Sequence, residues 1–379
     1  MFDFVLGPYR RRFHARGPGL YKADFILVPM KLIPNLALRT TLKSLTIAFV
    51  GAVVLLCVGF GYNFIVCHRL ARRYPVPGAF YAVNGRTMHL YCTGTGSPTV
   101  VIESGLGDDW LAWQKVQPEL SKTTRVCSYD RAGLGWSERQ PGPRDATSIA
   151  MQLHALLNEA NISGPLILVG HSAGGLYIRS FTALYPADVA GLVFVDATNP
   201  AGFKAIPGAE ETKEQRKERY REARLEWLKE ITGWKRLTGG CHETVPGGLE
   251  SYAAFYEAEA CRPVLALSWL GEWDDFERSA GEVAKLPCCT GLPILIISQD
   301  PDRPKPGWDA QSIAANPIWA SLQEQMKSLS TRSRRIIAHS SGHHIMLDRP
   351  DVIISGVQAF LADYRGTNDN PGYGTTVIQ

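Results

Sequence analysis

The fold is decided by the stretch Leu166-Ile-Leu-Val-Gly170-His171-Ser172-Ala173-Gly174-Gly175. A short apolar run stops at a glycine, and Ser172 follows inside a G-x-S-x-G pattern that leads into a helix-like segment. The turn is tight, so Gly170 and Gly174 must lack a Cβ if the backbone is to reverse and leave the serine hydroxyl exposed. The free N–H groups at the start of the next helix favour negative charge at the same place.

Strands and helices alternate on both sides of this stretch. Buried apolar runs that end in short loops are followed by segments in which apolar residues share one helical face. This alternation predicts an α/β fold with a mostly parallel central sheet and helices on both faces. The remaining strands are expected at 80–83 and 86–92 (a hairpin with an Asn-Gly turn), 99–102, 124–129, 191–195, 292–298 and 335–339, and the helices at 149–157, 176–185, 318–329 and 351–364.

The pattern changes over residues 200–290, which contain no convincing strand. Within them, residues 209–231 mix many charged side chains with a few apolar ones, which is typical of an amphipathic helix with a solvated face. We expect a helical cap here, inserted between two core segments, 79–199 and 291–365. The polar tail, 366–379, is predicted to be disordered.

The N-terminal part has the features of a membrane anchor. Residues 1–43 contain eight Lys and Arg against two Asp, and residues 44–66 carry no charge. As a helix, the uncharged run would be about 35 Å long, enough to cross a bilayer core of about 30 Å. The larger basic excess before the run favours a cytoplasmic N-terminus. We therefore expect a single-pass protein with a linker at 67–78 and its main domain on the extracytoplasmic side.

Composition excludes some functions. The net charge is +4, and the positive excess lies mostly at the N-terminus, so no nucleic-acid partner is expected. None of the eight cysteines has zinc-like C-x-x-C spacing, so no metal site is expected. The cysteine count fits either scattered thiols in a reducing compartment or two or three disulfides in an oxidising one.

A serine hydroxyl needs a base to accept its proton and a third group to orient that base. The chain provides such groups in order: Ser172, an acidic loop after the strand 292–298, and His343 after the last strand. With five motifs in order, the chain resembles the α/β-hydrolase superfamily over residues 79–365. The motifs are Ser104-Gly105-Leu106-Gly107, Tyr129-Asp130-Arg131-Ala132-Gly133-Leu134-Gly135-Trp136-Ser137, Gly170-His171-Ser172-Ala173-Gly174, Pro293 to Pro304, and Gly342-His343 with Pro350 beyond.

The resemblance implies roles for individual residues. Ser172 would be the nucleophile and His343 the general base, because the family's Gly-His step selects His343 over the adjacent His344. The oxyanion donors would be the backbone N–H groups of Ala173 and Leu106. No metal or organic cofactor is implied.

The resemblance leaves three residues open as the acid. Counting the family's pattern from Pro293 puts Asp302 at the acid position, which makes it the preferred residue, although Gln299 replaces the pattern's glycine. Asp196 is the second choice, because some relatives place the acid at the end of the preceding strand. Asp300 would serve if the loop is shorter.

The resemblance also bears on the cysteines. Its second and fourth strands are neighbours, so a disulfide between Cys92 and Cys127 is plausible if the domain is exported; two buried thiols are the alternative. In the cap, Cys241 and Cys261 would pair with each other or with the Cys288-Cys289 pair.

The implied activity is cleavage of a carboxylic ester, or a related acyl bond, through an acyl-enzyme on Ser172. An anchor and an amphipathic cap suit a lipid or other apolar ester, with a soluble ester or an amide as alternatives. An aspartate nucleophile would point to an epoxide hydrolase or a dehalogenase, and Ser172 argues against both. Two further functions stay open: a cofactor-free lyase or perhydrolase with the same residues, and a non-catalytic binding module on a hydrolase scaffold.

Overall fold

The computed structural model describes residues 36–207, 210–241, 245–263, 265–287, 289–303 and 310–366. The chain forms two compact units, residues 1–54 and 55–379. In the first unit, only the N-terminal part of helix α1 (Leu36–Arg73) is described. The predicted basic segment before residue 36 and the predicted tail after residue 366 lie outside the described residues.

Helix α1 is long and apolar enough to cross a membrane. It contains the predicted span 44–66 and continues to Arg73, so the first residues of the predicted linker are helical. Only 6% of its apolar window is buried, and large side chains such as Ile47, Phe49 and Leu55 are exposed. A helix that is apolar all round is either buried in protein or a membrane span.

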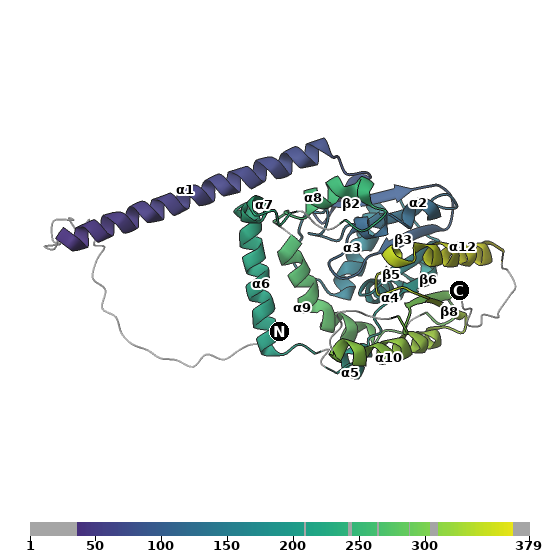
Figure 1. Ribbon diagram of the computed structural model, residues 1–379. Helices are drawn as coiled ribbons and strands as arrows, with labels where there is room; N and C mark the ends of the chain where they lie inside the picture. The colour runs from purple at the N-terminus through teal and green to yellow at the C-terminus, as the bar shows by residue number, and fades with distance from the viewer. Residues whose placement is uncertain are drawn as a thin grey trace, which may run out of the picture. The chain divides into compact units, whose positions relative to one another are not determined.

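An eight-stranded sheet forms the centre of the second unit, in the order β1-β2-β4-β3-β5-β6-β7-β8. The pairs β1–β2 and β2–β4 are antiparallel, and all other neighbours are parallel. The predicted α/β fold with a mostly parallel sheet is therefore confirmed (Figure 1). The strands are β1 (Ala79–Val83), β2 (Arg86–Thr93), β3 (Thr99–Glu103), β4 (Val126–Tyr129), β5 (Leu166–His171), β6 (Val189–Val195), β7 (Ile294–Gln299) and β8 (Ser333–Ala338).

Local sequence explains where several elements begin and turn. Asn84 and Gly85 both have positive φ angles, as a two-residue hairpin turn between β1 and β2 requires. Every residue of β3, β4 and β5 is buried, which matches their continuous apolar runs and a sheet that is covered on both faces. Helix α3 (Ala146–Glu159) begins after Asp145, whose carboxylate accepts the Ser148 N–H at 2.7 Å.

Helices cover both faces of the sheet and create two apolar cores. One core lies between the sheet and the helices α3 and α4 (Gly174–Leu184). The other lies between the sheet and α2 (Gln117–Leu120), α11 (Ile345–Asp348) and α12 (Pro350–Gly366). The remaining core helices are η2 (Trp110–Trp113), η3 (Pro186–Asp188), α10 (Ala310–Gln325) and η5 (Met326–Leu329).

The described part of the region predicted as a cap consists of helices joined by turns and loops, with no strand. Its longest helix in the charged run, α6 (Lys213–Ile231), starts with a capping box of Thr212 and Gln215. The expectation that this run is simply a solvated face holds only in part, because Arg219 is buried and donates to Asp274 of the neighbouring helix at 2.8 Å. The other helices are α5 (Gly202–Ala205), α7 (Trp234–Leu237), η4 (Glu250–Tyr252), α8 (Ala253–Glu259) and α9 (Leu265–Val283).

Disulfides link distant parts of the second unit at two places where both cysteines lie in the described ranges. Cys92 and Cys127 face each other across the antiparallel pair β2–β4, with a Cα–Cα distance of 4.0 Å. In the cap, Cys241 pairs with Cys261 at a Cα–Cα distance of 5.4 Å. Of the alternatives that the sequence left open, the structure therefore has the bonded form in both places.

Candidate active site

Ser172 lies in the turn between β5 and α4. Its φ is +50°, in the left-handed region that a residue with a Cβ rarely adopts, and its carbonyl accepts N–H groups from Gly175 at 3.0 Å and Thr198 at 2.8 Å. Strain of this kind costs about 1–3 kcal/mol and persists only where surrounding bonds fix it. The half-buried serine thus sits at a rigid corner at the carboxyl end of β5.

The two glycines around Ser172 are required by packing, as their spacing predicts. A Cβ added to Gly170 would lie 2.7 Å from the Gly174 carbonyl oxygen. A Cβ added to Gly174 would lie 2.4 Å from the Glu103 carbonyl oxygen, at the end of β3. Both contacts are with backbone, which has little freedom to move away.

His343 follows β8, and its partner is Asp196. The distance between His343 Nδ1 and Asp196 Oδ2 is 2.7 Å, and the Asp196 side chain is fully buried. Asp196 comes directly after β6, with a φ of +41° that turns the chain sharply at the strand end. Because Nδ1 faces a carboxylate, it carries a proton, and Nε2 is the nitrogen available for acid–base chemistry.

The second oxygen of Asp196 is held by two further donors. The backbone N–H of Gln299 donates to Oδ1 at 3.1 Å, and the indole Nε1–H of Trp319 donates to it at 3.0 Å. Hydrogen bonds to both oxygens fix the plane of the carboxylate beside His343. Trp319 lies on α10 and also packs edge-on against the His343 ring, with ring centroids 5.8 Å apart.

The other two acid candidates, Asp300 and Asp302, lie in the loop after β7. Asp302, the residue preferred from the sequence, is exposed, and its N–H donates to Asp300 Oδ1 at 2.9 Å. Asp300 Oδ2 accepts the N–H of Ser340 at 2.8 Å. These contacts tie the loop after β7 to the loop after β8, whereas His343 Nδ1 contacts Asp196. Counting positions from Pro293 favours Asp302 because the count uses only the segment around β7. It carries no information on the neighbouring strand β6, whose end places Asp196 against His343.

His171 supports the backbone of His343. Its side chain is buried, and its Nε2 lies 3.0 Å from the His343 carbonyl oxygen; because a carbonyl only accepts, Nε2 carries a proton. Burial lowers the pKa of His171, and Asp108 lies 3.6 Å from its Nδ1. This position suits a packing role for His171 rather than a part in the chemistry.

The loop Ser104–Gly107 runs beside the Ser172 turn. β3 and β5 are parallel neighbours in which Glu103 pairs with Gly170, so the loop after β3 begins level with the end of β5. This brings the chain segments of Leu106 and Ala173, the two predicted oxyanion donors, to the same edge of the sheet. Ala173 is buried directly before α4. Gly105 also fits tightly, because a Cβ there would lie 2.7 Å from His171 Nδ1.

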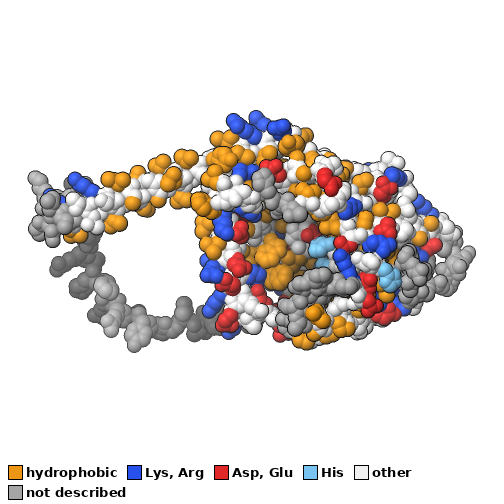
Figure 2. Space-filling view, in the orientation of Figure 1, with side chains coloured by type: hydrophobic (Ala, Val, Ile, Leu, Met, Phe, Trp, Pro, Cys, Tyr) orange, Lys and Arg blue, Asp and Glu red, His pale blue; other side chains and the backbone are white. Residues whose placement is uncertain are grey.

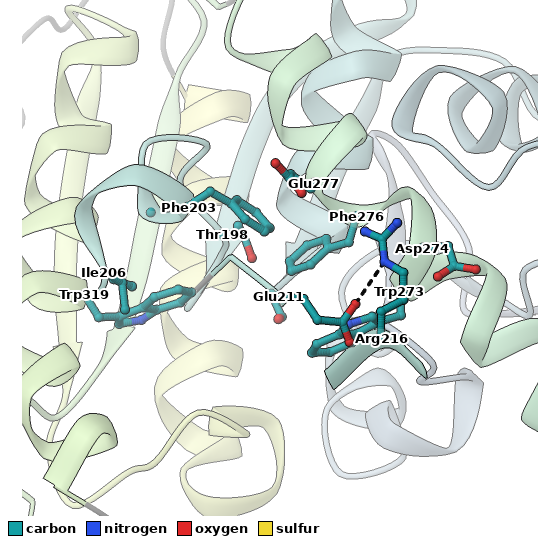
Figure 3. A pocket seen from close by; sticks show the side chains of 12 residues that line it. Thr198, Phe203, Ile206, Glu211, Arg216, Trp273, Asp274, Phe276, Glu277 and Trp319 are labelled. Atoms are coloured by element: carbon teal, nitrogen blue, oxygen red, sulfur yellow. Dashed lines mark hydrogen bonds and ion pairs between the residues drawn. The ribbon is translucent and has the colours of Figure 1, made fainter. Parts of the chain in front are cut away.

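A cavity of about 270 Å³ opens at Ser172. The cap contributes most of its walls. Ile206 lies beside Trp319 of the core, and Phe276 and Trp273 lie on the opposite side (Figure 3). Charged side chains also line it: Glu211 pairs with Arg216 at 3.4 Å, and Asp274 and Glu277 lie on α9. On the molecular face drawn in Figure 2, apolar side chains gather in a hollow with charged side chains around it.

Sequence reasoning missed Trp319 and the cavity walls. Trp319 lies in a stretch that reads only as a helix, and its contact with Asp196 spans 123 residues. No local signal identifies it. Among the described residues, no three His, Cys, Asp or Glu side chains converge as a metal site would require.

Known proteins resemble this chain over the same region. The model of the Alpha/beta hydrolase family matches residues 100–355. The uncharacterized protein YbdG of Bacillus subtilis is 27% identical over 86% of this chain and 100% of its own length. The probable transporter efuK of Hormonema carpetanum is 26% identical over 71% of this chain, which spans 40% of that protein's length. An esterase structure from Thermogutta terrifontis has a TM-score of 0.54 and 20% identity, and the match covers 76% of this chain and 99% of that one.

Proposed function

Because the chain belongs to the alpha/beta hydrolase family, we propose that it is a serine hydrolase that cleaves a carboxylic ester or a related acyl bond. The contact between His343 Nδ1 and Asp196 Oδ2, at 2.7 Å, is the observation that carries the proposal. A buried carboxylate that orients a histidine, beside a strand-to-helix turn whose half-buried serine lines a cavity, suits a nucleophile elbow and its base.

In the proposed reaction, the Ser172 oxygen attacks the acyl carbonyl carbon while His343 Nε2 accepts the serine proton. The carbonyl oxygen becomes an oxyanion, which the N–H groups of Ala173 and Leu106 would stabilise. When the intermediate collapses, His343 gives the proton to the departing alcohol. Water then attacks the acyl-enzyme with His343 as the base, and the acid and the free serine are released. Asp196 stabilises the imidazolium in each half-reaction.

The cavity at Ser172 favours an apolar acyl group. Its volume of about 270 Å³ and its aromatic and aliphatic walls suit a short or medium acyl chain, and burial of each CH₂ contributes about 0.8 kcal/mol. The charged side chains around it would meet the polar part of the substrate. A small-molecule acyl ester is therefore the proposed partner, and an aspartate-dependent reaction such as epoxide opening is not proposed because the turn holds a serine.

We also propose that α1 anchors the protein in a lipid bilayer as a single span, with the hydrolase domain that follows it on the extracytoplasmic side. The charge distribution of the N-terminal residues supports this orientation, as positively charged segments remain cytoplasmic. The disulfides Cys92–Cys127 and Cys241–Cys261 support it as well, because disulfides persist in oxidising compartments.

A fluorophosphonate probe tests the activity on the detergent-solubilised full chain. We expect covalent labelling of Ser172, read by peptide mass spectrometry, and its loss in Ser172→Ala and His343→Ala. Absence of labelling in folded wild-type protein would contradict an activated serine and would favour a non-catalytic role. Strong turnover of a cyanohydrin or of peroxide with little ester hydrolysis would instead favour a lyase or perhydrolase.

A further inference from the structure

A buried charge cluster lies behind the Ser104–Gly107 loop. Its members are Arg131, which follows β4, Glu103 at the end of β3, and Glu272 of the cap helix α9. The side chains of all three are at most 2% exposed. Charges at this depth need complete pairing, so each contact in the cluster constrains its neighbours.

Glu272 joins the cap to the core through both of its oxygens. Oε1 accepts Arg131 Nε–H at 2.7 Å, and Oε2 accepts Arg131 Nη2–H at 2.9 Å, which is a two-point contact. Oε2 also accepts the backbone N–H of Gly107 at 2.9 Å. The cap carboxylate therefore holds both the arginine and the last residue of the loop.

Arg131 holds the rest of the loop. Its Nη1 donates to the Ser104 carbonyl at 2.8 Å, and its Nη2 donates to the Gly105 carbonyl at 2.6 Å. The Gly105 carbonyl belongs to the same planar peptide group as the Leu106 N–H. In a trans peptide the C=O and N–H point in opposite directions, so fixing the oxygen on Arg131 also fixes the direction of the Leu106 N–H.

The electrostatics of the cluster agree with a closed network. Burial alone would raise the pKa of Glu272, but Arg131 and Arg144 hold that pKa below its usual value. Burial raises the pKa of Glu103 to about 7 despite its contact with Arg131. Glu272 is therefore the firmly charged carboxylate of the cluster, and Arg131 depends on it more than on Glu103.

We propose that Glu272 is a positioning residue. Through Arg131 and the Gly107 N–H, it fixes the direction of the Leu106 N–H, the proposed oxyanion donor. This rests on the proposed serine hydrolase activity. Helix α9 is then a fixed part of the catalytic framework, and the cap cannot lift at α9 without releasing the loop.

The variants Glu272→Gln and Arg131→Lys test this in the full chain. Both keep side chains of similar size but weaken the two-point contact and the bonds to the loop. We expect kcat for p-nitrophenyl butyrate, and the rate of fluorophosphonate labelling, to fall at least tenfold in each, with KM within about twofold. A kcat defect with little KM change follows because the loop acts on the transition state rather than on the acyl cavity. The double variant should be little worse than either single variant, since both act through one loop.

Asp275→Asn is the matched control. Asp275 lies one turn further along α9 and also accepts a core backbone N–H, that of Arg144 at 2.6 Å, but it does not contact the loop. We expect its kcat to stay within about twofold of wild type. Equal losses in Asp275→Asn and Glu272→Gln, or a Glu272→Gln defect confined to KM, would show a general loosening of the cap and overturn the proposal.

Hydrogen exchange on the wild-type protein gives a test that does not depend on the folding of variants. The Gly107 amide should exchange as slowly as the amides of α9, because the loop opens only when α9 leaves the core. Fast exchange at Gly107 beside a protected α9 would overturn the proposal. If wild-type protein fails to label at Ser172 while Gly107 is protected, the hydrolase proposal fails and the cap–loop coupling stands by itself.

Discussion

At the scale of single residues, Asp196 determines what His343 can do. Asn in its place keeps the size but removes the negative charge, and its amide NH₂ would face His343 Nδ1 and favour the wrong tautomer. We expect Asp196→Asn to lower kcat by about 10³–10⁴-fold while the protein stays folded. Steady-state hydrolysis of p-nitrophenyl butyrate measures this.

Asp302→Asn is the control for that substitution. Asp302 is exposed, so its replacement should leave kcat within about twofold of wild type. The reverse result, with Asp302→Asn inactive and Asp196→Asn active, would return the acid to the position that the sequence pattern favours.

The residues that sequence could identify are those fixed by local geometry. Ser172, Gly170 and Gly174 belong to one turn, and the clash of a Cβ with backbone explains why the spacing is so restrictive. The sequence left Asp196 as one of three candidates for the acid, because the choice depends on how the ends of β6, β7 and β8 meet. The Trp319 contact depends on the same meeting of distant segments and has no local pattern.

At the scale of elements, a carboxyl pair joins the cap to the core. Asp109 precedes η2, Glu259 ends α8, and their side chains share a hydrogen bond. Burial first, then nearby carboxylates, raises the pKa of Asp109 to about 7 and that of Glu259 well above its usual value. The pair therefore keeps at least one proton in the folded protein under conditions in which the unfolded chain has lost both.

Stability should consequently fall as the pH rises. Between about pH 4 and pH 7 the folded state binds more protons than the unfolded state, so each such group lowers the free energy of unfolding by up to about 1.4 kcal/mol per pH unit. We expect Glu259→Gln to flatten this fall, because one titrating group is gone and the amide can still donate to Asp109. Urea unfolding at pH 5, 6, 7 and 8 measures the slope. An unchanged slope in Glu259→Gln, equal to that of the exposed Glu250→Gln, would contradict the assignment.

The helices of the cap also show that the burial of a charged side chain is hard to predict from sequence. The run that contains α6 reads as a solvated face, yet Arg219 and Glu230 within it are buried. Glu272 lies in a helix whose pattern likewise gives no sign of a buried ion pair with Arg131. A charge that pairs across the core–cap boundary resembles a surface charge in sequence, because its partner is more than a hundred residues away.

At the scale of the whole molecule, the fold and the proposed membrane orientation rest on different kinds of sequence signal. The strand alternation alone predicts the sheet, since each buried strand and covering helix has its own periodicity. The side of the membrane does not follow from packing, because both faces of a bilayer offer the same apolar interior. The proposed orientation rests instead on the charges around α1 and on the disulfides Cys92–Cys127 and Cys241–Cys261, which are typical of an oxidising compartment.

The orientation can be tested at Asn161. The sequence has a single Asn-X-Ser/Thr acceptor, Asn161-Ile162-Ser163, and Asn161 is exposed after α3 with a φ of +54°. N-glycans are added only on the extracytoplasmic side. Expression with microsomes from a glycosylating host should give a form that endoglycosidase shortens and that Asn161→Gln lacks. A chain without a glycan, whose Cys92 and Cys127 react with a thiol reagent before any reduction, would put the domain that follows α1 on the cytoplasmic side.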